Sequence, residues 1–137
     1  MLKRRCGQIA ERGFTLIELM IVLTIMLILM SVAIPIYQKS VEHARESALK
    51  QDLATLRSAI DQFTLDKDKA PQSLDELVSA GYLRQIPKDP MTDSNSTWQP
   101  VQDDNAIASP DQETGGIIDV HSGATGVSSE GTAFNTW

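Results

Sequence analysis

Residues that could do chemistry are few in this sequence, and one of them lies inside a long apolar run. Residues 14–34 contain a single charged side chain, that of Glu18. A carboxylate costs roughly 2.5–3.5 kcal/mol at the centre of a lipid bilayer, and less near its edge. A plain membrane anchor or secretion signal gains nothing from such a group, so Glu18 indicates a more specific role.

A second group of ionisable residues lies further along the chain, in a stretch expected to be a loop between two strands. It contains the carboxylates of Asp103, Asp104, Asp111 and Glu113. Calcium prefers carboxylate and carbonyl oxygens from flexible loops, so these four residues form a candidate calcium site. No EF-hand spacing is present, and the alternative is that the charges only keep the loop soluble. Calcium is the one cofactor that the sequence suggests.

Catalytic patterns are absent from the sequence. It has no G-x-S-x-G, H-E-x-x-H or phosphate-loop motif, and it has a single cysteine, Cys6. His43 and His121 lie far apart along the chain, and each is expected to face solvent. We therefore expect a protein that is not an enzyme.

Charge is distributed unevenly over the 137 residues, whose formal net charge is −6. Four basic residues against one acidic residue give the first thirteen residues a charge of +3. The rest of the chain therefore carries −9, from eight basic and seventeen acidic residues. Because phosphate binding needs a basic face, this excess of acid argues against nucleic acid as a partner.

The apolar run is long enough to cross a membrane. Its twenty-one residues span about 30 Å as a helix, which is the thickness of the hydrocarbon core. The basic segment before it places the N-terminus in the cytoplasm and the remainder of the chain outside. Three outcomes stay open at this point: a permanent anchor, a secretory signal cut after Ala33, or cleavage after Gly13 that keeps the helix.

The stretch G-F-T-L-I-E at residues 13–18 resembles the class III signal of type IV pilins and type II secretion pseudopilins. The resemblance implies that a prepilin peptidase cuts between Gly13 and Phe14 on the cytoplasmic side, and that the new amine of Phe14 is methylated. It also implies that Glu18 is required for assembly. Pro35 stands where the family commonly has a proline.

A second stretch, from Gly81 to Pro90, resembles the head of major pseudopilins in particular. It contains G-Y-L, a spacer and P-x-D-P, but Met91 and Thr92 replace the usual tryptophan and glycine. The resemblance implies a homo-oligomeric pseudopilus of a type II secretion system, which drives export of folded proteins. Its partners would be the prepilin peptidase, the inner-membrane secretion platform and minor pseudopilins. The subunit would cross the inner membrane once, with its head in the periplasm.

Two alternatives remain beside this interpretation. One lies in the same superfamily: a type IV pilus or competence pilin subunit. The other belongs to a different class: a secreted or membrane-anchored binding module, whose signal is cut after Ala33 or not at all.

The pattern of residues predicts an α+β fold with one long helix over about residues 14–66. Pro35, inside this helix, is expected to kink or locally unwind it. The later part of the helix carries an apolar stripe in a 4-3-4-3 spacing. The stripe consists of Leu49, Leu53, Leu56, Ile60 and Phe63.

A small head follows the helix. Ser73 and Glu76 form a capping box at the start of a short helix that Gly81 ends. Residues 98–101 and 116–121 are the expected strands of a small antiparallel sheet. The tail is rich in Gly, Ser and Thr, and its aromatic residues Phe134 and Trp137 suggest that it folds back onto the head.

These expectations divide the chain into four parts. Residues 1–13 are a leader that is removed, and residues 14–37 are the hydrophobic transmembrane and assembly helix. Residues 38–66 continue the helix in amphipathic form, and residues 67–137 make the globular head.

Overall fold

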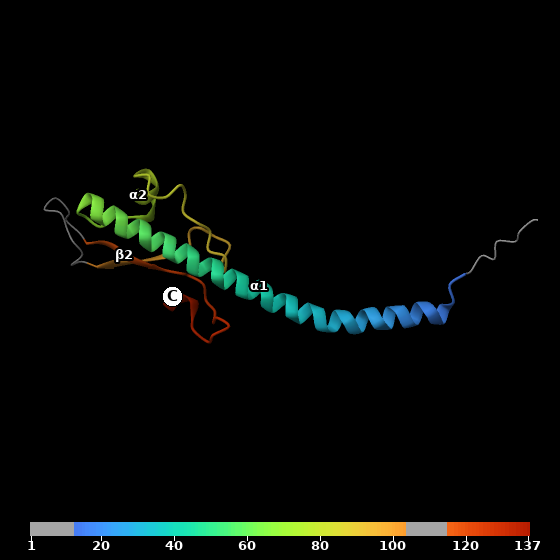
Figure 1. Ribbon diagram of the computed structural model, residues 1–137. Helices are drawn as coiled ribbons and strands as arrows, with labels where there is room; N and C mark the ends of the chain where they lie inside the picture. Colours follow the sequence, from blue (N-terminus) through green and yellow to red (C-terminus); the bar gives the residue numbers. More distant parts are fainter. Residues whose placement is uncertain (1–12, 104–114) are drawn as a thin grey trace, which may run out of the picture. The chain divides into compact units, whose positions relative to one another are not determined.

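The computed structural model of the protein describes residues 13–103 and 115–137. The chain divides into two compact units, Met1–Lys39 and Ser40–Trp137. The predicted α+β class is confirmed (Figure 1). The elements in chain order are α1 Leu16–Lys67, α2 Leu74–Ser79, β1 Gln99–Asp103, β2 Gly116–His121 and the short 3-10 helix η1 Phe134–Thr136.

Helix α1 is 52 residues long and agrees with the predicted helix to within two residues at either end. It ends at Lys67, because Asp68 takes a left-handed backbone conformation with a φ of +52°. Pro35 lies within α1, and the residues on both sides of it are helical. The local unwinding expected at Pro35 is therefore not found.

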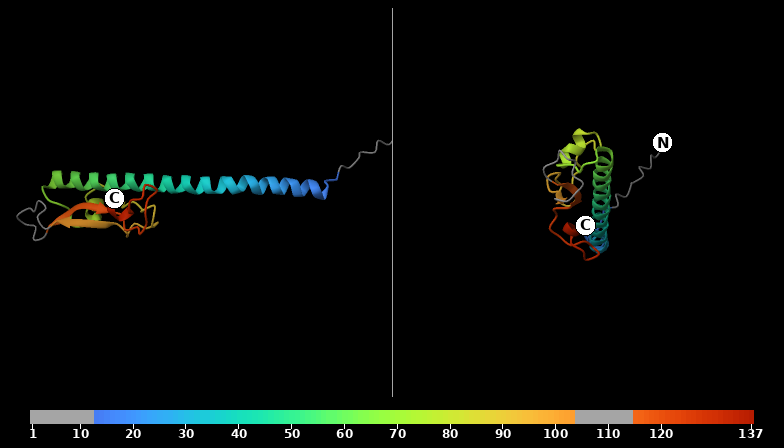
Figure 2. Two further views of the ribbon diagram at one scale, coloured as in Figure 1. Left: turned by 90° about the horizontal axis from the view of Figure 1, so that it is seen from below. Right: turned by 90° about the vertical axis from the view of Figure 1, so that its left-hand side faces the viewer.

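The core of the second unit is built on the predicted stripe of α1. All five stripe residues are buried, and none is more than 2% exposed. Both views of Figure 2 place the sheet alongside the C-terminal part of α1. The stripe packs against buried side chains from α2, β2, η1 and the residue just before β1, among them Leu77, Trp98, Ile117, Val120 and Phe134.

Helix α2 is fixed at both ends by the predicted residues. The Ser73 hydroxyl accepts a hydrogen bond from the N–H of Glu76 (3.2 Å), and the Glu76 carboxylate accepts one from the N–H of Gln72 (2.7 Å). Beyond the other end, Gly81 has a φ of +85° and donates to the carbonyl of Val78 (3.1 Å). Only a residue without a side chain adopts this conformation easily, so Gly81 turns the chain sharply back.

Strands β1 and β2 form a two-stranded antiparallel sheet in which Pro100 lies opposite Val120. A bulge interrupts the register between Val101 and Gln102. The prediction for β2 matches residue for residue, whereas β1 begins one residue later and ends two residues later than predicted. Trp98 lies just before the strand, and its buried indole donates to the carbonyl of Pro87 (2.8 Å).

The polar tail folds back onto the head, as its aromatic residues predict. Phe134 is buried in the core, and its ring meets that of Trp137 edge to face, with 5.2 Å between ring centroids. The ammonium of Lys50, on α1, lies 4.5 Å from the centroid of the Trp137 ring. The last residues of the chain are therefore packed against the middle of α1.

Replacing one stripe leucine should separate core packing from surface effects. Leu56 is fully buried, so Leu56→Ala should lower the free energy of unfolding by about 2–5 kcal/mol. Leu65 lies on the same helix but is 78% exposed, and Leu65→Ala should change it by less than about 0.5 kcal/mol. Urea unfolding of the full chain in detergent, followed by tryptophan fluorescence, measures both. Equal effects of the two substitutions would contradict this account of the core.

Candidate processing and assembly site

The residues implied in processing lie at the start of α1. The Thr15 hydroxyl accepts a hydrogen bond from the N–H of Glu18 (3.3 Å), and the Thr15 carbonyl accepts one from Leu19 (3.2 Å). Thr15 is therefore the N-cap of the helix, and Glu18 is the acidic residue of its first turn. A carboxylate there interacts favourably with the positive end of the helix dipole. The T-x-x-E spacing is that of a capping box, a signal that our sequence analysis did not use.

Gly13 and Phe14 precede the helix and are exposed. A Cβ atom added at Gly13 would meet no described atom within 4 Å, and its backbone needs no left-handed conformation. The described fold therefore gives no reason for a glycine at this position. Phe14 is 82% exposed, so the bond between the two residues is accessible.

The apolar part of α1 has no partner within the described chain. Its large hydrophobic side chains between Leu16 and Tyr37 are each at least 45% exposed, and by length and composition this is a candidate membrane span. The hydroxyls of Thr24 and Ser31 donate to helix carbonyls at Met20 and Ile28, both at 2.7 Å. The two hydroxyls are thus satisfied without water, as a lipid environment requires.

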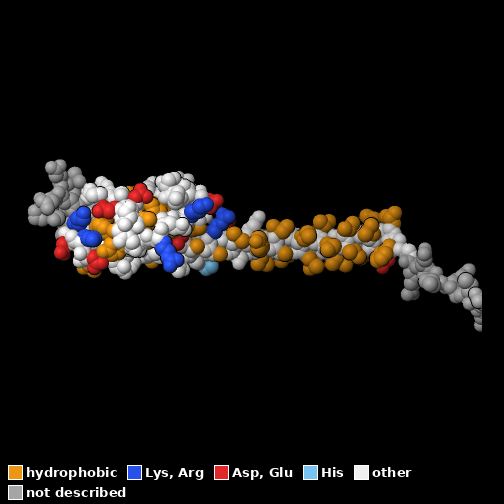
Figure 3. Space-filling view, turned by 90° about the horizontal axis from the view of Figure 1, so that it is seen from above, with side chains coloured by type: hydrophobic (Ala, Val, Ile, Leu, Met, Phe, Trp, Pro, Cys, Tyr) orange, Lys and Arg blue, Asp and Glu red, His pale blue; other side chains and the backbone are white. Residues whose placement is uncertain are grey.

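Figure 3 shows the same contrast on the surface. Hydrophobic side chains cover the N-terminal part of α1 almost without interruption, whereas charged side chains gather over the second unit. Among the described residues, those of the second unit present the surface expected of a domain in water.

Asp89, in the P-x-D-P stretch, is fully buried in the second unit. Its carboxylate accepts hydrogen bonds from the Ser122 hydroxyl (2.5 Å) and from the N–H of Met91 (2.8 Å). Both oxygens are therefore satisfied within the protein, as a buried carboxylate requires. Asp89 joins the turn before β1 to the segment after β2, so it has a structural role.

Glu46 links α1 to the tail of the chain. Its side chain is 8% exposed and accepts hydrogen bonds from the hydroxyl and the N–H of Ser129, both at 2.6 Å. These two bonds lower the pKa of Glu46, because they favour its charged form over the neutral one. Sequence analysis missed this role, although Glu46 lies three residues before Leu49 and so continues the spacing of the buried stripe.

A second link runs from α1 to β2. The Arg57 guanidinium donates to the carboxylate of Asp119 (2.6 Å) and to the carbonyl of Val120 (3.1 Å). Partial burial raises the pKa of Asp119, but hydrogen bonds from Arg57 and from the N–H of Val120 outweigh it, so the net shift is downward. Glu46 and Arg57 thus hold two different parts of the C-terminal half on one helix.

Comparison with known proteins supports the resemblance seen at the N-terminus. Residues 10–34 match the family model described as the prokaryotic N-terminal methylation motif. The chain is 32% identical to the type II secretion system core protein G of Klebsiella pneumoniae, over 93% of this chain and 94% of that protein. The chain belongs to the type II secretion system core protein G family. The protein of that name from Escherichia coli K12 is 30% identical, over 80% of this chain and 89% of its own length.

A competence protein is also similar to this core protein G homologue. The competence protein ComGC of Halalkalibacterium halodurans is 37% identical, but the match covers only 53% of this chain and 72% of that protein. No solved structure gives a significant match. The matches over nearly the whole chain therefore favour the pseudopilin prediction over the competence pilin.

Two further predictions for this core protein G homologue concern histidine and calcium. His121 does not face solvent as expected: its side chain is 29% exposed, and Nδ1 lies 2.5 Å from the Trp137 carbonyl oxygen. Asp104, Asp111 and Glu113 lie outside the described residues, and Asp103 is the last residue of β1. Within residues 13–103 and 115–137, no group of three or more potential ligands is placed to hold a metal. Calcium therefore stays a prediction from the sequence.

The link between Glu46 and Ser129 predicts a dependence of stability on pH. Since the pKa of Glu46 is lower in the folded state than its ordinary value of 4.5, its stabilising effect is complete above that value. The effect is lost as the pH falls through the lowered pKa. Glu46→Gln should therefore be less stable than the wild type at pH 7, and the difference should shrink in acid.

Unfolding in urea at a series of pH values measures this difference. Glu42→Gln serves as the control, because Glu42 is an exposed carboxylate one helical turn earlier. If the Glu46 and Glu42 variants followed the same pH profile, the link between α1 and the tail would not depend on the charge.

Proposed function

We propose that this protein is the structural subunit of a helical pseudopilus filament in a type II secretion system, and that it drives export of folded proteins without catalysis. The observation that carries the proposal is the exposed apolar segment of α1, with a single carboxylate in its first turn. Membership of the core protein G family supports it. A helix that is apolar on all sides needs lipid or other copies of itself as partners.

Processing is the first step that we infer. A prepilin peptidase cuts between Gly13 and Phe14, and the new amine of Phe14 is methylated. The exposed bond supports this assignment. The fold does not need a glycine at position 13, so recognition by the peptidase explains why a glycine is there. Residues 1–13 are a leader in this scheme, residues 14–37 insert into the membrane, and the rest forms the stalk continuation and the head.

Assembly is the second step. Removal of the leader creates a positive amine at Phe14, one helical turn before Glu18. In a filament, neighbouring copies are displaced along the axis, so Glu18 of one copy pairs with the amine of the next. The pairing offsets the cost of a carboxylate among packed helices, and it fixes the axial register because only one displacement brings the two groups together. Pro35 contributes to assembly by leaving the Ser31 carbonyl without its helical donor.

Location and partners follow from the same scheme. The basic leader keeps the N-terminus in the cytoplasm, the apolar part of α1 crosses the inner membrane once, and the acidic head lies in the periplasm. The partners are further copies of the chain, the prepilin peptidase, the inner-membrane secretion platform and minor pseudopilins. A filament that grows from the membrane then pushes cargo outward.

Intact-mass spectrometry of the protein extracted from membranes tests the processing step. We expect a chain that begins at Phe14, with one additional methyl group on its amine. Gly13→Leu should leave the leader attached, since the peptidase needs a backbone without side-chain obstruction. A chain that begins at Ile34 would instead establish secretory cleavage and overturn the filament assignment.

Substitutions of Glu18 test the assembly step. Glu18→Leu should still be inserted and cut after Gly13 but should form no filaments, because the partner of the amine is lost. Glu18→Asp, one methylene shorter, should form fewer filaments than the wild type. Shearing of overexpressing cells followed by electron microscopy counts filaments, and the mass of the membrane fraction confirms cleavage. Normal filaments from Glu18→Leu would exclude the pairing mechanism while leaving the processing step intact.

A further inference from the structure

The segment between α2 and β1 contains an asparagine in a sequence that can accept a sugar. Asn95, Ser96 and Thr97 form the pattern N-x-S/T, with no proline in the middle position. The other two asparagines of the chain do not lie in this pattern. The bacterial form of the pattern adds an acidic residue two positions before the asparagine, and Asp93 stands there. One asparagine in the chain therefore matches the full acceptor sequence.

The structure leaves the side chain of Asn95 open to solvent. Asn95 is exposed, and its amide makes no hydrogen bond to any residue in 13–103 or 115–137. The hydroxyls of its neighbours Ser94 and Ser96 are hydrogen-bonded to one another (2.9 Å), and the Ser94 hydroxyl also accepts from the N–H of Ser96 (3.2 Å). The backbone is therefore held on both sides of Asn95 while its amide stays accessible.

Backbone hydrogen bonds close the turn that leads to this asparagine. The N–H of Asp89 donates to the carbonyl of Ser94 (2.9 Å), and the N–H of Asp93 donates to the carbonyl of Asp89 (2.8 Å). On the other side, Trp98 is buried in the core and anchors the chain before β1. A group attached to Asn95 would therefore lie outside the core, and the fold would not have to rearrange to carry it.

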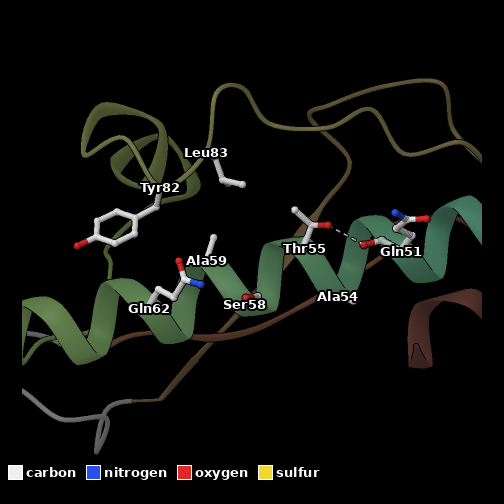
Figure 4. A pocket seen from close by; sticks show the side chains of 8 residues that line it. All are labelled: Gln51, Ala54, Thr55, Ser58, Ala59, Gln62, Tyr82 and Leu83. Atoms are coloured by element: carbon white, nitrogen blue, oxygen red, sulfur yellow. Dashed lines mark hydrogen bonds between the residues drawn. The ribbon is translucent and has the colours of Figure 1, made fainter.

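Other exposed amides of the second unit lie in a different setting. Gln51 and Gln62 belong to α1 and line a groove of about 400 Å³, with Tyr82 and Leu83 on its opposite side (Figure 4). A transferase has to draw the acceptor into its own active site. A helix resists this because its backbone hydrogen bonds would have to break, whereas a surface turn permits it. Asn95 is thus an amide that such an enzyme can reach.

The hydroxyl of Thr97 indicates when the transfer takes place. In the folded head this hydroxyl is hydrogen-bonded to the Thr92 hydroxyl (2.5 Å), and Thr97 is half-buried. The acceptor pattern requires the hydroxyl of Thr97 as well as the amide of Asn95. The transfer therefore precedes closure of the turn, and the folded head then leaves the modified side chain exposed.

We propose that Asn95 is the acceptor of an N-linked glycan, and that Asp93 and Thr97 are the residues by which the transferase recognises it. The inference rests on the proposed function in one respect, because such a transferase acts outside the cytoplasm, where the proposed location has the head. The attached group is a carbohydrate, which suits an exposed turn because it is itself well solvated.

The chemistry is a glycosyl transfer from an oligosaccharide linked to a polyprenyl pyrophosphate in the membrane. The amide nitrogen of Asn95 forms a bond to the first carbon of the sugar, and the bond from that carbon to the pyrophosphate oxygen breaks. The pyrophosphate leaves with the bonding electrons, and the amide proton passes to a base of the enzyme. Nothing is oxidised or reduced in this step.

Intact-mass spectrometry of the protein from the membranes of its own cells tests the inference. We expect a chain that is heavier than the processed sequence by a whole number of sugar residues. Fragmentation by electron transfer, which keeps side-chain modifications attached, should locate the added mass on Asn95. A chain without added mass, or with the mass on a serine or threonine hydroxyl, would overturn the proposal.

Substitutions within the pattern give a matched set of controls. Asn95→Gln and Thr97→Val should both lose the added mass, whereas Thr97→Ser keeps the hydroxyl and should retain the mass. Asn135→Gln removes an exposed asparagine outside the pattern and should leave the mass unchanged. Retention of the mass by Asn95→Gln, or its loss from Asn135→Gln, would overturn the assignment.

Asp93→Asn tests the acidic position by itself. Residue 93 has a φ of +54°, a left-handed conformation that asparagine tolerates, so the turn keeps its shape while the charge is removed. The added mass should disappear from most of the chains. Full modification of this variant would overturn the recognition assigned to Asp93.

The same mass spectra separate this inference from the proposed function. A chain that begins at Phe14 and carries no sugar would overturn this inference alone. A chain that begins at Ile34 and carries the sugar on Asn95 would support this inference and overturn the proposed function. A chain that keeps residues 1–13 and carries no sugar would count against both.

Discussion

The apolar surface of the first part of α1 must leave water, and the chain provides nothing within its described residues to cover it. This constraint governs the rest of the molecule. Polar groups inside the segment have to be satisfied locally, as the hydroxyls of Thr24 and Ser31 are by their own helix. The single charge has to lie at the end of the segment, where the helix dipole and the Thr15 cap accommodate it. A partner for the remaining surface has to come from lipid or from other copies.

The second unit differs from the first because it covers its own apolar core. It has to hold a small head on one helix without a disulfide. Its core is one buried stripe, and two polar links on α1 fix what surrounds that core. Glu46 holds the turn at Ser129, and Arg57 holds strand β2 through Asp119. Both links use a charged group that makes more than one hydrogen bond, and such charge-assisted bonds are stronger than bonds between neutral groups.

Features formed by residues that lie close together in the sequence were predictable, and contacts between residues far apart in the sequence were not. The stripe of α1, the capping box at Ser73 and the turn at Gly81 each depend on residues a few positions apart, and all three are confirmed. Arg57 and Asp119 are 62 residues apart, and nothing in their local sequence indicates that they meet. Trp98 is of a residue type that is common in strands, but it lies just before β1, where its indole donates to the carbonyl of Pro87. At the candidate site, processing and assembly were implied by the resemblance of residues 13–18 to the class III signal and stay predictions, whereas the cap formed by Thr15 was available from spacing and was overlooked.

The position of Phe134 in the core has a consequence for the order of events during synthesis. Phe134 belongs to the same core as side chains of α1 that are made about eighty residues earlier. A ribosome releases the N-terminal segment first, so the apolar helix and its processing motif are available while the head still lacks part of its interior. Contacts of such large sequence separation slow the folding of a domain, because the loop between the two residues must close first. The head therefore completes its core only after Phe134 has emerged, and the apolar helix is available for membrane insertion while the globular part is still open.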